Sequence, residues 1–184
     1  MIMKKTILTL FALLFVLTSN AQFYAGGRLG WWRDGNSHDK RFTIQPEVGY
    51  EWNDCLSFGA VVGFYKDKTQ LVKEAAPAGE QNTITRSFEF SPYVRYNVVK
   101  AGPVNLFVDG TVGFATSRTA SQASRNSFRI GARPGVSVAL GKSFSAVAHI
   151  GFVGYADSET GLYRDGAGID LSGNELTFGV FYRF

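Results

Sequence analysis

The chain has 184 residues, which suits one domain. Its formal net charge is +4, but two of the lysines lie in an expected leader, so the charge makes no case for a nucleic-acid partner. Cys55 is the only cysteine and there are two histidines. An internal disulfide is therefore excluded, an intrinsic zinc site is disfavoured, and we expect no metal or cofactor. Abundant glycine and phenylalanine favour a β-barrel over a helical protein.

Residues 1–21 have the features of a secretory signal peptide. Two lysines precede an apolar core over residues 7–17, and Ser19-Asn20-Ala21 is a small-residue cleavage site. The apolar run is short for a transmembrane helix, and no comparable run follows it. We therefore expect one domain over residues 22–184. If that domain enters a membrane, it must be a closed barrel, because lipid cannot satisfy free backbone groups.

Beyond residue 22, apolar side chains alternate with polar or small ones, which is the period of a strand with one apolar and one polar face. In the seventh such segment, the alternation predicts that Phe152 faces outward and Tyr155 inward. The fold class that we predict is all-β, an eight-stranded antiparallel up-and-down transmembrane barrel. The expected strands span residues 23–32, 41–52, 56–66, 84–98, 104–116, 127–140, 144–156 and 174–184.

The connections between these segments alternate in length. Outer-membrane barrels have short periplasmic turns and long extracellular loops. We therefore expect both termini in the periplasm, the loops 33–40, 67–83, 117–126 and 157–173 outside, and short turns at 53–55, 99–103 and 141–143.

A repeated motif supports this arrangement. Pro46, Pro92 and Pro134 each begin a Pro-x-Val-x-(Tyr/Val) segment, and Phe178 begins a similar one. The copies recur every 42 to 46 residues, which suggests a β-hairpin repeated four times. Because proline cannot donate to a sheet ladder, we expect a bulge or a locally unpaired position at each proline.

The two faces decide between a membrane barrel and a soluble lipocalin-like cup, whose inside would be apolar. The outward face is apolar, and its aromatic residues gather at two levels, as at two membrane interfaces. Lys66 and Arg86 lie on it near the outer edge, where they could reach lipopolysaccharide phosphates. The inward face suits a lumen filled by ion pairs. It carries Arg28, Glu47, Glu51, Glu89, Arg95, Asp109, Arg129, Arg133, Glu175 and Arg183.

The leader, the alternating strands, the Pro-x-Val-x-Tyr segments and the closing Tyr182-Arg183-Phe184 resemble the small outer-membrane β-barrel proteins of the OmpA/OmpX-like superfamily. The resemblance implies the outer membrane of a Gram-negative bacterium, with outer-membrane lipids and lipopolysaccharide as neighbours. It also implies that the barrel assembly machinery reads the last strand through Phe184, Tyr182 and Val180. It specifies no activity.

Two histidines bear on the alternative that this is a lipid A or phospholipid-modifying enzyme, which needs a base beside a nucleophile. His38 lies in the loop sequence Ser37-His38-Asp39, and such a loop collects these residue types without catalysis. His149 faces inward, where we expect an interior carboxylate to satisfy it. We therefore expect no enzyme and no catalytic residue.

The favoured hypothesis is an integral outer-membrane barrel with a structural or surface-interaction role. We expect its charged interior to act as a plug, because eight strands enclose a space that side chains can fill. The long loops 67–83 and 157–173 would offer an adaptable surface for an extracellular ligand. A narrow low-conductance pore is the alternative.

Overall fold

The computed structural model describes residues 23–33, 40–71, 81–119, 123–159, 162–171 and 175–184. The expected signal peptide, residues 1–21, and His38 lie outside the described residues. Among the residues described, no helix is long and apolar enough to span a membrane.

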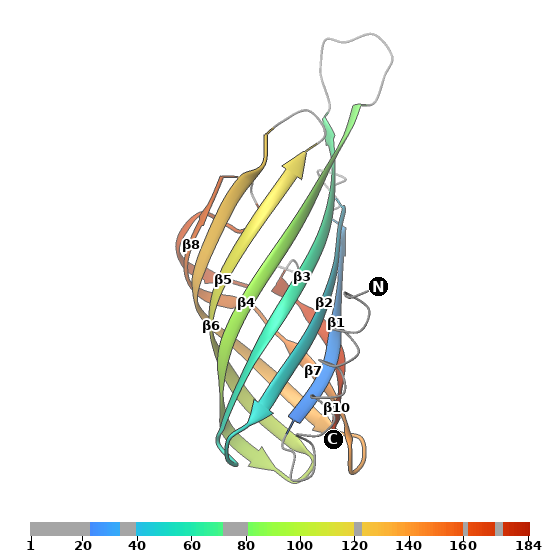
Figure 1. Cartoon of the computed structure of the whole chain (residues 1–184), viewed down its shortest axis with the longest axis vertical. Coiled ribbons are helices and arrows are strands. Elements are labelled where there is room, and N and C mark those ends of the chain that lie inside the picture. Colours follow the sequence, from blue (N-terminus) through green and yellow to red (C-terminus); the bar gives the residue numbers. More distant parts are fainter. Residues whose placement is uncertain (1–22, 34–39, 72–80, 120–122, 160–161, 172–174) are drawn as a thin grey trace, which may run out of the picture.

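The strands form one closed antiparallel barrel, tilted against its long axis (Figure 1). Consecutive strands pair from β1 to β6, and β10 pairs with both β1 and β7, which closes the ring. The seventh position is shared by β7 and β8, and β9 continues the eighth position above β10. The strands are β1 (Phe23–Arg33), β2 (Lys40–Glu51), β3 (Leu56–Leu71), β4 (Gln81–Ala101), β5 (Val104–Thr119), β6 (Arg125–Ala139), β7 (Phe144–His149), β8 (Phe152–Ser158), β9 (Gly166–Asp170) and β10 (Thr177–Arg183).

The break between β7 and β8 reverses the predicted orientation of the upper seventh strand. Both halves pair with β6, but their registers differ by one residue. Gly151 has a positive φ of 76°, a conformation that glycine adopts without a steric penalty. The one extra residue between β7 and β8 moves every following side chain of β8 to the opposite face of the sheet. Phe152 therefore points inward and is 7% exposed, whereas Tyr155 points outward and is 47% exposed. The prediction for these two residues was wrong.

The prolines interrupt the sheet as expected. Pro46 has a partner in β1 but none in β3, Pro92 has one in β3 but none in β5, and Pro134 has one in β5 but none in β7 or β8. Pro46 and Pro92 thus each leave one side of their strand locally unpaired while the register continues unshifted. At Pro134 the side without a ladder partner keeps one hydrogen bond, because the Pro134 carbonyl accepts from the Ile150 N–H at 3.0 Å. This confirms the unpaired positions expected from the missing N–H.

Several predicted connections are shorter than expected. β3 and β4 remain paired as far as Leu71 and Gln81, so much of the predicted loop 67–83 is a hairpin stem. β9 lies within the predicted loop 157–173, and β4 runs into the predicted turn 99–103. The first two stems lack a clear apolar alternation, so the sequence pattern ends before the backbone pairing does.

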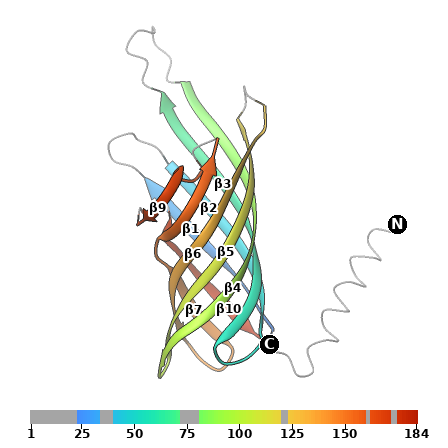
Figure 2. The same ribbon diagram turned by 90° about the vertical axis from the view of Figure 1, so that its left-hand side faces the viewer.

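The barrel has an inverted distribution of polarity. Its outward face exposes large apolar side chains, whereas arginines, carboxylates and hydroxyl groups are buried in the lumen. We call the end with residues 52–55, 102–103 and 140–143 the turn end, and the opposite end the loop end. The first and last described residues meet at the turn end, where the Phe184 N–H donates to the Phe23 carbonyl at 3.0 Å (Figures 1 and 2).

Candidate functional site in the barrel lumen

The half of the lumen toward the turn end contains a group of paired charges that we call the turn-side cluster: Arg28, Glu47, Arg95, Asp109 and His149. Arg95 lies between the two carboxylates, with its Nε 2.7 Å from Asp109 Oδ1 and an Nη 3.1 Å from Glu47 Oε1. Arg28 Nε lies 3.0 Å from the other oxygen of Glu47. Five different strands supply these side chains, so the cluster links these five strands across the lumen.

His149 has both ring nitrogens engaged and is completely buried. Arg28 approaches Nδ1 at 3.0 Å, and Asp109 lies 2.8 Å from Nε2. Because a guanidinium only donates, Nδ1 must accept and Nε2 must carry the proton donated to Asp109. This confirms that an interior carboxylate satisfies His149, and it leaves the neutral ring no free nitrogen for acid–base chemistry.

A second group, the loop-side cluster, lies nearer the loop end and contains Glu89, Arg129, Arg133 and Glu175. Arg129 is 2.6 Å from Glu89 and 3.4 Å from Glu175. Arg133 is less closely held, since its nearest carboxylate is Glu175 at 3.9 Å. Tyr65 and Ser91 donate to Glu89 from the lumen wall.

The two clusters are each electrically balanced. Each contains two arginines and two carboxylates, and His149 adds no charge in its neutral form. Buried charges are tolerable when they are paired and hydrogen-bonded, whereas removal of one partner leaves an uncompensated charge in a medium of low dielectric constant. The geometry therefore favours fixed cross-braces that fill the lumen.

An aromatic layer closes the lumen beside the turn-side cluster. Tyr24, Tyr93, Phe107 and Phe181 pack together there. Each lies directly opposite a glycine on the neighbouring strand, because a side chain there would occupy the space of the ring. The Arg95 guanidinium lies 4.0 Å from the centre of the Phe107 ring, a cation–π geometry. The rings therefore pack against the charged cluster and fill the lumen beside it.

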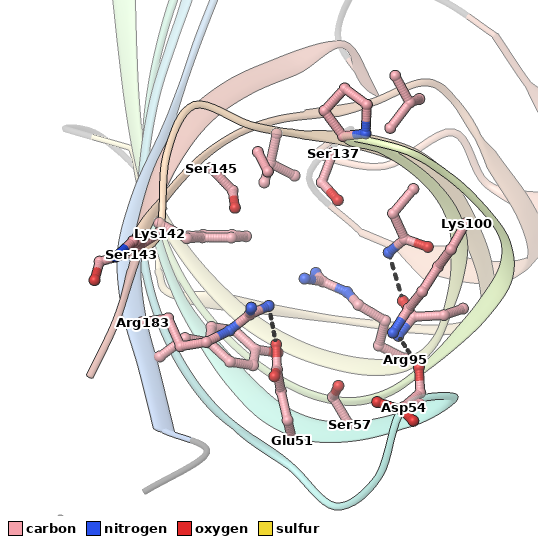
Figure 3. Close-up of a pocket in the computed structure, with 18 of the residues that line it drawn as sticks. Glu51, Asp54, Ser57, Arg95, Lys100, Ser137, Lys142, Ser143, Ser145 and Arg183 are labelled. Atoms are coloured by element: carbon pink, nitrogen blue, oxygen red, sulfur yellow. Dashed lines mark hydrogen bonds and ion pairs between the residues drawn. The ribbon is translucent and has the colours of Figure 1, made fainter.

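A cavity of about 280 Å³ opens at the turn end (Figure 3). Arg95 is its innermost charged residue, and Lys100 and Lys142 are among the residues of its rim. Arg183 and Glu51 form an ion pair of 2.6 Å on the wall, and the Arg183 side chain is 53% exposed. None of the loop-side cluster lines this cavity. The cavity is therefore a vestibule that ends at the aromatic layer.

Two buried residues between β8 and β9, Leu162 and Tyr163, fill the lumen at the loop end. Leu162 and Tyr163 are buried beside Tyr65, and the Tyr163 ring lies 4.5 Å from the Arg129 guanidinium carbon. Arg41 donates to the Leu162 carbonyl at 3.0 Å. Burial raises the pKa of the Tyr163 phenol well above its usual value, although nearby Arg129 opposes the shift. The lumen is thus covered at this end by a neutral ring.

The structure places eight of the ten predicted lumen charges in the two clusters and the other two, Glu51 and Arg183, at the rim of the vestibule. Sequence reasoning missed the tyrosines that bond to them. Tyr65 and Tyr93 occupy alternate, inward positions of their strands, which could have identified them. Tyr163 lies in a connection and carries no periodic signal. Val180, Tyr182 and Phe184 are exposed on the outward face of β10 or just beyond it.

A family model and the solved structure of one barrel protein agree with this architecture. A model of the outer membrane protein beta-barrel domain matches residues 6–184. The crystal structure of Neisserial surface protein A (NspA) superposes with a TM-score of 0.55 at 18% identity, over 89% of this chain and 98% of that chain. Ail, the attachment invasion locus protein of Yersinia pestis, has a TM-score of 0.40 at 15% identity, over 88% and 95%. The likeness to NspA shows a shared fold alone. No curated protein sequence matches.

Proposed function

This chain belongs to the outer membrane protein β-barrel domain family, and on that premise we propose that it is a non-enzymatic barrel of the Gram-negative outer membrane whose lumen is closed to ions. Its role is structural or lies in surface interactions. The long-loop end faces the cell exterior and the turn end faces the periplasm, as in other barrels that begin as secreted chains.

The observation that carries the proposal is the pairing of charges across the lumen at two levels. An eight-stranded barrel is just wide enough for its side chains to fill. Here an aromatic layer lies at one end of that stack, and Leu162 and Tyr163 cover the other. An ion would have to displace hydrogen-bonded arginines from their carboxylates at both levels, which supports a plug over a pore.

Two further parts of the proposal concern partners. The apolar outer surface contacts outer-membrane lipids and lipopolysaccharide, and the barrel assembly machinery recognises the last strand through Phe184, Tyr182 and Val180. Surface interactions use the loop end, where the sequences of loops 67–83 and 157–173 mix charged and small residues that suit an extracellular ligand.

Conductance in a planar lipid bilayer tests the closed lumen. Refolded residues 22–184 should insert without producing discrete current steps, while a porin in the same bilayer serves as the positive control for detection. Gel mobility before and after heating verifies that the inserted protein is folded. Reproducible unit steps from folded protein would overturn the plug and favour the narrow-pore alternative.

A lipid assay tests the non-enzymatic part. After incubation of the protein with lipid A and with phospholipid, mass spectrometry should find both lipids unchanged, because His149 has no free nitrogen. A mass change that disappears in His38→Ala would make the protein an enzyme and contradict the proposal.

A further inference from the structure

Three cations lie side by side on the outward face near the loop end: Lys66 in β3, Arg86 in β4 and Arg118 in β5. The sheet register pairs Lys66 directly with Arg86, and Arg86 directly with Arg118; all three side chains are exposed. These strands are neighbours on one side of the barrel (Figure 1). Since adjacent strands are about 4.8 Å apart, the three cations start from backbone positions spanning about 10 Å.

Among the described residues, no acidic side chain balances this cationic row. None of the three forms an ion pair with a carboxylate there, and their one side-chain hydrogen bond in that part of the chain runs from Arg118 Nε to Ser124 Oγ at 3.3 Å. Asp67, the acid next to Lys66 in sequence, is engaged with Arg41 at 2.7 Å. Like charges directly opposite each other on a sheet are destabilising. The row is therefore suited to an anion from outside the chain.

A shallow apolar groove lies directly beneath the row on the same outward surface. Its volume is about 570 Å³, and it crosses β4, β5, β6 and β8. Four phenylalanine rings line it, and the smaller Thr116 and Asn126, paired across β5 and β6, lie among them. The sheet register places Arg86 two residues above Phe88, about 7 Å along the strand. The rings are Phe88, Phe90, Phe114 and Phe128.

We propose that the cationic row and the groove together form a binding site for a phosphorylated glycolipid of the outer leaflet. The proposal rests on the proposed function, which places the loop end at the cell surface. Arg86, Arg118 and Lys66 bind the headgroup phosphates, because guanidinium and ammonium groups form charge-assisted hydrogen bonds with phosphate oxygens. An acyl chain of the same molecule lies along the phenylalanine rings.

The charges around the groove also orient the ligand. Asp157 pairs with Phe128 at the far side of the groove, and Glu159 lies near it on the wall. These carboxylates repel a phosphate from the β8 side, so the headgroup is directed toward β3, β4 and β5. A cationic row several strands wide fits a headgroup with more than one phosphate better than a single phosphodiester.

Lipid binding in detergent tests the site. Native mass spectrometry of the full purified protein would compare diphosphoryl lipid A with its dephosphorylated form. We expect the diphosphoryl lipid to bind at least about tenfold more tightly. The triple variant Lys66→Gln, Arg86→Gln, Arg118→Gln should lose that preference and bind both forms equally, whereas Lys100→Gln, Lys142→Gln, at the turn end, should retain it.

A second variant probes the groove independently. Thr116→Trp fills the space among the rings. It should weaken the binding of both lipid A forms to a similar degree, because it removes contacts with the acyl chain and leaves the three cations in place. Heat-dependent gel mobility checks folding, and the single variant Arg86→Gln replaces the triple variant if the latter fails to fold.

The proposal is overturned if the folded triple variant, which lacks the three cations, keeps its preference for diphosphoryl lipid A. It is also overturned if phosphatidylglycerol or phosphatidylethanolamine binds better than diphosphoryl lipid A, since either would mean a phospholipid site. These outcomes are separable from the proposed function, because a conducting barrel could still bind the lipid and a silent barrel could fail to bind it.

Discussion

The two charge clusters of the lumen each contain two arginines and two carboxylates, but they differ in ion-pair distance and in the backbone that supports the side chains. In the turn-side cluster, Arg95 reaches two carboxylates within 3.1 Å, and every member comes from a paired strand. In the loop-side cluster, Glu175 precedes β10, and its contacts with Arg129 and Arg133 are 3.4 and 3.9 Å. Tyr163, which covers Arg129, also comes from a connection.

The difference follows from backbone support. Strands that hydrogen-bond on both sides fix their side chains, and fixed charges can meet at short distance without a further entropy cost. Residues 175 and 163 lie outside the ladder, so their side chains have less support. We infer that the turn-side cluster carries most of the cross-lumen stabilisation and that the loop-side cluster can rearrange more easily.

The largest expected effect is that of Arg95→Met. The substitution removes the guanidinium shared by Asp109 and Glu47 and leaves two buried carboxylates short of a partner. The free energy of unfolding should fall by about 3–5 kcal/mol. Urea unfolding from lipid vesicles, followed by tryptophan fluorescence, measures it. A loss below that of Glu175→Gln would reverse the ranking of the clusters.

The next largest effect is expected in the aromatic layer beside the turn-side cluster. A Cβ at Gly59 would collide with the Tyr93 ring and lie 2.7 Å from the Val48 carbonyl oxygen, so Gly59→Val should overpack the layer and cost about 1–3 kcal/mol. At Gly27 the nearest atom to an added Cβ is 3.8 Å away, so Gly27→Val is the matched control and should be tolerated. The same urea titration compares them. Equal losses would show that Tyr93 moves aside.

Glu175→Gln tests the weaker support of the loop-side cluster. The change removes a charge that lies 3.4 Å from Arg129 and 3.9 Å from Arg133, but Arg129 retains Glu89. We expect a loss of about 1–2 kcal/mol in unfolding free energy. In a planar bilayer the variant should remain silent, because the turn-side cluster still blocks the lumen. Current steps would place the main barrier in the loop-side cluster.

Arg183→Gln should have the smallest effect, because its ion pair with Glu51 is at the open rim and the arginine is half exposed. Exposed pairs contribute about 0–1 kcal/mol. The measurement is the free energy of unfolding of both proteins at low and at high salt. The difference between the wild type and Arg183→Gln should shrink as salt rises, because salt screens the ion pair that only the wild type has. A loss as large as that of Arg95→Met would mean that rim and lumen charges act as one network.

The barrel could be predicted from the sequence because a strand wall between lipid and a narrow lumen imposes a strict two-residue alternation. Glu47 lies between Pro46 and Val48, and Arg95 between Val94 and Tyr96. Any inward position is thereby identified without knowledge of its partner. The prediction is wrong where this two-residue alternation is interrupted or absent. One inserted residue at Gly151 reverses Phe152 and Tyr155, and the polar stem of the β3–β4 hairpin beyond residue 66 lacks the alternation that would distinguish it from a loop.

The sequence by itself determined the number of barrel positions, the direction of most side chains and the charge types inside. Only the tertiary structure decided which charges meet, that Tyr163 covers Arg129, and that Lys66, Arg86 and Arg118 form one row. The physical reason is that alternation is a local property of each strand. Pairing across a lumen or along a wall depends on the relative shift of strands far apart in sequence, which the barrel fixes only when it closes.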